Sequence, residues 1–132
     1  MSKFGCKCGH LILDRTDDLP YKGTVLPDKD SFPFYDRCSE QVIGYINALR
    51  DGKRDEWSKG YYQGFSDYDV ILALIQMEYV RRKRDIYQCE NGGRIHIQEA
   101  GSEHFLSFSP DDENWRDILK STTSLNSPEK TS

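Results

Sequence analysis

Two short segments near opposite ends of the chain, each containing cysteine and glycine, constrain its fold more than any other feature. Residues 6–10 read Cys-Lys-Cys-Gly-His, and residues 89–94 read Cys-Glu-Asn-Gly-Gly-Arg. In a zinc knuckle a tight turn places two thiolates on one metal ion, and two such turns complete a tetrahedral site. Glycine lets the chain turn back. The pattern therefore predicts two halves of a metal-stapled β core, in which Cys6 and Cys89 are neighbours in space.

Both segments depart from the usual knuckle. The first has one residue between its cysteines instead of two, and the second has Gly92 where its second cysteine would stand. Three thiolates leave one coordination position open, which His10, Cys38 or a water molecule could fill. The alternative is that no metal binds and the cysteines are small buried apolar residues. The candidate zinc ligands are Cys6, Cys8, Cys89 and His10.

Apolar periodicity predicts an α+β fold. Apolar residues at three- and four-residue steps indicate helices, and alternating residues indicate strands. The expected strands lie near residues 11–13, 21–26, 85–89, 94–98 and 104–108, and the expected helices near 39–51, 67–83 and 110–120. We expect a small antiparallel sheet, made of the N-terminal strand and the 85–109 meander with its zinc-ribbon-like hairpins, to pack against the two main helices. Residues 1–120 would form one domain, and residues 121–132 a disordered tail.

Charge and hydropathy restrict the partners. The 132 residues carry a net charge of −4, with a pI near 5.3. Nucleic-acid binders usually show a basic surface, so a nucleic-acid partner is disfavoured, whereas an acidic surface speeds encounter with a basic protein. No apolar run reaches the roughly 18–20 residues that span a bilayer, and the N-terminus has no apolar signal core. We therefore expect a cytoplasmic protein, in which thiols stay reduced.

The sequence contains no recognisable catalytic pattern. Its acidic clusters occur in loops and at expected helix starts, where carboxylates usually act as caps. His96 falls on the polar face of its expected strand, which predicts a solvated ring. We therefore expect a protein that is not an enzyme.

The aromatic segment between the two main helices has two interpretations. Tyrosine and tryptophan are enriched at the centres of protein interfaces, and they equally suit a loop that covers a small core. The candidate partner-binding residues are Trp57, Tyr61 and Tyr62.

Three segments together resemble a group of small bacterial zinc-ribbon-like proteins. Those proteins open with Cys-x-Cys-Gly-His, as residues 6–10 do, and close with Asp-Ile-Tyr-x-Cys-x-x-Cys-Gly-Arg and Ser-x-Ser-Pro. Residues 85–94 and 107–110 keep these motifs except at Gly92. The resemblance covers both ends of the domain and implies a fold rather than a function.

These observations favour a non-enzymatic protein-binding module. Its concrete form is an immunity or antitoxin protein that neutralises a basic bacterial toxin through charge-steered contact. The alternative is a zinc-ribbon-like protein with a nucleic-acid-associated or regulatory role, which the acidic charge makes less favourable.

Overall fold

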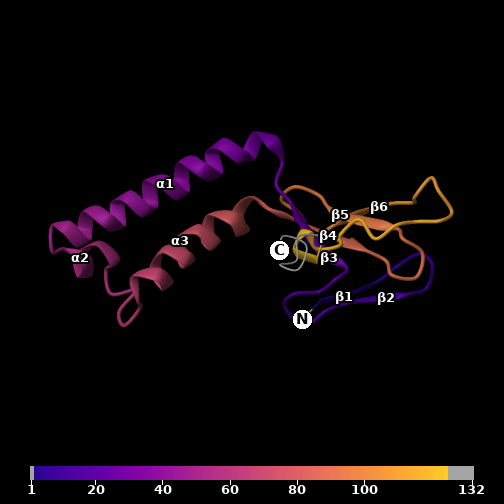
Figure 1. Cartoon of the computed structure of the whole chain (residues 1–132), viewed down its shortest axis with the longest axis horizontal. Helices are drawn as coiled ribbons and strands as arrows, with labels where there is room; N and C mark the ends of the chain where they lie inside the picture. The colour runs from indigo at the N-terminus through magenta and orange to yellow at the C-terminus, as the bar shows by residue number, and fades with distance from the viewer. Residues whose placement is uncertain (1, 125–132) are drawn as a thin grey trace, which may run out of the picture. The chain divides into compact units, whose positions relative to one another are not determined.

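The computed structural model describes residues 2–124, which form a mixed α+β fold, as predicted (Figure 1). The chain divides into two compact units. The β unit comprises the described residues of 1–25 and 84–132, and the helical unit comprises residues 26–83. The single domain expected for residues 1–120 stays a prediction. Most of the predicted tail, from residue 125 onward, lies outside the described residues, and Thr122–Ser124 forms a 3₁₀ turn.

The β unit contains two antiparallel sheets. The first pairs β1 (Ser2–Gly5) with β2 (Leu11–Asp14), and the second has the order β3 (Lys22–Val25), β4 (Arg84–Gln88), β5 (Ile95–Gln98) and β6 (Phe105–Phe108). The expected strands are present, but the expected pairing of the N-terminal strand with the meander is wrong. The turn at residues 6–10 folds β1 back onto β2, so β3 joins the meander instead.

The β1–β2 hairpin packs on one face of the four-stranded sheet. Cys6, Ile12, Tyr87 and Cys89 form its buried cluster, and the half-buried ring of Phe4 contacts the Tyr87 ring edge-on at 5.2 Å. The two cysteine segments therefore lie within the core of the unit and not at its periphery.

His96 lies on this covered face and is 3% exposed, so the prediction of a solvated ring is wrong. Its ring contacts Phe4 at 5.1 Å, and its Nδ1 lies 2.7 Å from Oγ of Ser107. Burial, together with the charge of Arg94, lowers the pKa of His96. Alternation placed His96 on the correct face, but the β1–β2 hairpin covers that face.

Residues 110–120 do not form the expected helix. Side chains hold the segment in local turns, because Asp112 accepts from the N–H of Asn114 at 2.9 Å. Such local bonds compete with helical ones. The buried side chain of Gln88 donates to the carbonyl of Arg116 at 2.8 Å and accepts from the N–H of Ile118 at 3.1 Å. The segment is therefore bound along the sheet by a polar residue of β4.

The helical unit is an antiparallel pair, α1 (Asp28–Arg50) and α3 (Asp67–Arg82), with the short α2 (Arg54–Ser58) between them (Figure 1). The expected second helix is confirmed, and Ser66 caps it by accepting from the N–H of Asp69 at 3.1 Å. The first helix begins well before its expected start at residue 39. Its acidic first turn favours an early start, and the helix continues through Pro33, where one backbone hydrogen bond is lost.

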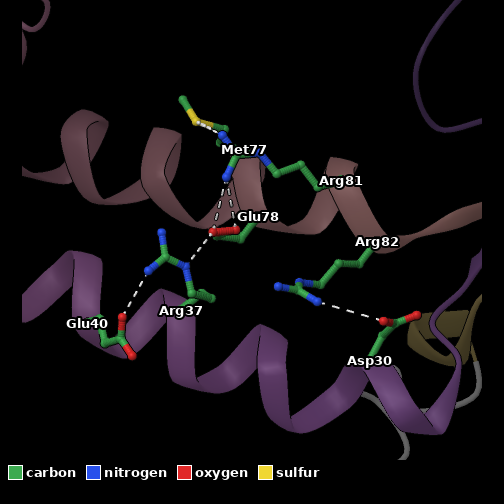
Figure 2. A network of polar contacts seen from close by, with 7 residues as sticks. All are labelled: Asp30, Arg37, Glu40, Met77, Glu78, Arg81 and Arg82. Atoms are coloured by element: carbon green, nitrogen blue, oxygen red, sulfur yellow. Dashed lines mark hydrogen bonds and ion pairs between the residues drawn. The ribbon is translucent and has the colours of Figure 1, made fainter.

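A buried carboxylate fixes α1 against α3. Glu78 is 3% exposed and forms ion pairs with Arg37 of α1 and Arg81 of α3, each at 3.4 Å (Figure 2). Near the start of α1 and the end of α3, Arg82 lies 3.7 Å from Asp30. A buried charge without its partners costs several kcal/mol, so this network favours one register of the two helices. Among the described residues, no helix is long and apolar enough to cross a bilayer.

Two adjacent glycines in the β4–β5 turn have different environments. Gly93 has a φ of +74°, and a Cβ added there would lie 2.2–2.5 Å from atoms of Trp115. A Cβ added at Gly92 would meet nothing within 4 Å, and the φ of Gly92 is not in the left-handed region. The indole ring therefore packs directly against the backbone of residue 93.

We expect Gly93→Ala to lower the free energy of unfolding of the β unit by about 2–4 kcal/mol, because left-handed strain adds to a steric clash. Gly92→Ala is the matched control and should change it by less than about 1 kcal/mol. Urea denaturation followed by tryptophan fluorescence measures both. Equal effects of the two variants would contradict the close approach of Trp115.

Candidate metal centre

Two turns of the β unit deliver three sulfur atoms to one point. Cys6 and Cys8 lie in the turn between β1 and β2, and Cys89 lies in the turn between β4 and β5. All three Sγ atoms lie within 4.8 Å of one another, and those of Cys8 and Cys89 are 3.4 Å apart. Sulfurs around a tetrahedral zinc ion, bound at about 2.3 Å, lie about 3.8 Å apart. The group could therefore hold a metal ion, and the predicted meeting of Cys6 with Cys89 is confirmed.

The two turns have the same hydrogen-bonding plan. The carbonyl of Cys6 accepts from the N–H of Gly9 at 2.9 Å, and that of Cys89 accepts from the N–H of Gly93 at 2.8 Å. In both turns the N–H of the cysteine then donates to the carbonyl after the glycine, at 2.8 Å. Both glycines have positive φ, +97° and +74°. The second turn contains one more residue, so it keeps the knuckle spacing that the first turn lacks.

Backbone N–H groups stabilise negative charge on the sulfurs. The N–H of His10, with smaller contributions from the neighbouring cysteines and Asn91, lowers the pKa of the exposed Cys8 thiol to about 6. Burial raises the pKa of Cys89, against the opposing N–H groups of Asn91 and Gly92. The Asn91 amide nitrogen also lies 3.7 Å from Cys8 Sγ. Cys8 is therefore a thiolate at neutral pH.

The two residues predicted as a possible fourth ligand, His10 and Cys38, do not belong to the sulfur group. No ring nitrogen of His10 lies within 4.8 Å of all three sulfurs, so this residue contributes its backbone to the turn. Cys38 belongs to α1 of the helical unit, where burial and the charge of Glu78 raise its pKa. Within the described residues, the candidate metal group consists of three sulfurs.

The three aromatic candidates for partner binding lie in different environments. The half-buried Trp57 stacks on Tyr62 at 5.8 Å and contacts the tilted ring of Tyr45 at 5.1 Å. Tyr62 is half-buried as well, whereas Tyr61 is 84% exposed. Trp57 and Tyr62 therefore cover the core of the helical unit, and Tyr61 is free to meet a partner.

Fold and site together define a small α+β protein in which two knuckle-like turns bring three thiols to one point. Residues 2–112 match a family model described as a domain of unknown function, DUF8617. Because the match spans most of the chain, the protein belongs to this family. Neither the curated proteins nor the solved structures include a match to the chain. Its function must therefore be argued from its own residues.

Gly92 occupies the knuckle position of the missing fourth thiolate, and its surroundings leave room for a side chain. We expect Gly92→Cys to bind zinc or cobalt at least about tenfold more tightly than the natural chain, because four thiolates complete the tetrahedron. Competition with a chromophoric chelator measures the affinity, and cobalt absorption reports the number of thiolates. Gly92→Ala should leave the affinity unchanged. If Gly92→Cys bound no more tightly than Gly92→Ala, the open position would not lie beside residue 92.

Proposed function

We propose that a structural zinc ion bound by Cys6, Cys8 and Cys89 closes the β unit. The convergence of three sulfurs from two turns supports this proposal. Thiolate ligands favour soft and borderline metals, of which zinc is the usual structural choice. A water molecule takes the fourth position. Within the described residues no carboxylate oxygen joins the group, so its protein ligands would all be thiolates.

The architecture of the β unit gives this ion a structural role. An isolated two-stranded hairpin is marginally stable in water, and β1–β2 forms a sheet of its own without backbone pairing to the other sheet. It is attached by packing around Cys6 and Cys89 and by contacts of Asp14 with Lys22 and Tyr87. An ion shared by these residues would cross-link the hairpin to the β4–β5 turn, and so stabilise the folded state.

We expect protein purified without a histidine tag to contain about one zinc ion per chain, and Cys89→Ser to lose it, because two thiolates hold zinc weakly. Cys38→Ser is the matched control and should keep the metal, since Cys38 belongs to α1. Mass spectrometry of metal content, with thermal unfolding before and after chelation, measures both. Equal metal loss in the two variants, or none bound to the natural chain, would refute the staple.

We propose further that the chain is a non-enzymatic protein-binding module of the immunity or antitoxin kind. Its net charge of −4 suits charge-steered encounter with a basic toxin. Tyr61 offers a large exposed ring, and the stack of Trp57 on Tyr62 beside it limits the motion of the loop. A rigid aromatic side chain of this kind loses little entropy on binding.

Affinity purification of the tagged full chain from its native cells tests this role. We expect a basic partner that stops growth when expressed alone and is neutralised by co-expression, with binding that weakens as salt rises. Tyr61→Ala should weaken the complex by about 1–2 kcal/mol, whereas Leu11→Ser, an exposed residue of the β unit, should not. Recovery of no toxic partner would count against the proposal, and salt-dependent binding to mixed DNA and RNA would favour the nucleic-acid alternative.

A further inference from the structure

Each long helix of the helical unit carries a second apolar stripe besides the one buried between them. The stripe on α1 follows seven-, four- and three-residue steps, and it comprises Phe32, Tyr35, Val42, Ile46 and Leu49. The stripe on α3 comprises Tyr68, Leu72 and Ile75. Six of these eight residues are exposed, between 37% for Leu72 and 76% for Phe32. Such spacing is typical of a helix that packs against another helix.

The two stripes lie on the same side of the helix pair. Successive residues of a helix are about 100° apart around its axis. In each helix the second stripe therefore lies about 120° around the axis from the buried stripe, in the direction in which residue number increases. The buried stripes are marked by Tyr45 and Ala48 on α1, and by Val70 and Leu74 on α3. Because α1 and α3 run antiparallel, equal rotations in the same sense turn both second stripes to one side. We call these eight residues the apolar face.

The opposite side of α1 is already covered. A Cβ at Gly44 would lie 3.5 Å from Nε1 of Trp57, and Trp57 itself belongs to α2. Gly44 stands about 100° from Tyr45 in the direction away from the apolar face. The aromatic cluster around α2 therefore protects one side of α1, while the apolar face has no such cover within its unit.

We propose that a second copy of this chain covers the apolar face, so that two helical units form a four-helix bundle about a two-fold axis. Taking about 200 Å² for a fully exposed large side chain, the apolar face and the neighbouring Ile43 leave roughly 700 Å² accessible. A standard interface buries about 800 Å² on each partner. Two antiparallel helix hairpins packed face to face are a common bundle architecture.

Charges beside the apolar face are self-complementary. Asp36, Ile43 and Arg50 are exposed and stand seven residues apart in one row of α1. Neither Asp36 nor Arg50 forms an ion pair with another described residue. A two-fold axis near Ile43 pairs Asp36 of one chain with the partner's Arg50, and the reverse. This match favours a second copy over an unrelated protein.

Sedimentation equilibrium of the full chain tests the proposal over about 1–100 µM, a range that reports dissociation constants in the micromolar region. We expect a reversible dimer with twice the chain mass of 15.3 kDa. Leu72→Glu should weaken dimerisation at least about tenfold, because it buries a charge at the apolar face. Tyr61→Ser, which removes an exposed ring outside that face, should leave it unchanged. Circular dichroism confirms that each variant stays helical.

A charge exchange separates the proposed arrangement from other dimers. Asp36→Arg and Arg50→Asp should each weaken the dimer, because like charges then face one another across the axis, and the double variant should restore it. If the chain stayed monomeric at about 100 µM, the proposal would be overturned, and the apolar face would be left for a different protein. A dimer indifferent to Leu72→Glu, or a double variant without rescue, would overturn it as well.

Discussion

The meeting of the β1–β2 turn with the β4–β5 turn is the constraint on which the β unit depends. Cys6 and Cys89 belong both to the three-sulfur group and to the apolar cluster that attaches the hairpin to the sheet. The helical unit is inserted between β3 and β4, which pair directly from Val25 opposite Arg84. The insertion must therefore begin and end at neighbouring points, and an antiparallel helix pair meets that requirement. The 3.7 Å contact of Asp30 with Arg82 joins its two ends.

The protonation of the sulfurs follows from the same geometry. The N–H of His10 and the neighbouring thiols lower the pKa of Cys8 to about 6, while burial raises the pKa of Cys89. At neutral pH the Cys8 sulfur is thus a thiolate, 3.4 Å from the sulfur of Cys89. Metal binding requires thiolates, so the affinity for a divalent ion must fall as the pH falls. Because Cys8 is exposed and Gly92 has no side chain, the three-sulfur group is more accessible to solvent than a closed four-thiolate centre.

Local signals in the sequence predicted the strands, the helix from Asp67 and the meeting of the cysteine segments. Glycine positions, cysteine spacing and apolar periodicity each involve only a few neighbouring residues, so they can be recognised in the sequence. The predictions were wrong where contacts between residues far apart in the sequence determine the structure. Gln88 binds the backbone of residues 116 and 118, and the β1–β2 hairpin covers His96. Neither contact can be recognised from the sequence around the residues it affects. The early start of α1 was readable from the acidic residues Asp28 and Asp30 in its first turn.

The two units differ in what their own residues can bury. In the β unit, a hairpin and a sheet enclose a cluster to which thiols contribute, so one ion there would add to packing already present. In the helical unit only Tyr45, Ala48, Val70 and Leu74 are buried apolar residues, and a polar contact at Glu78 completes the seam between the helices. Helices in water gain most of their stability from burying an apolar stripe. A pair with a second, exposed stripe would therefore gain further stability by burying that stripe against the proposed second copy.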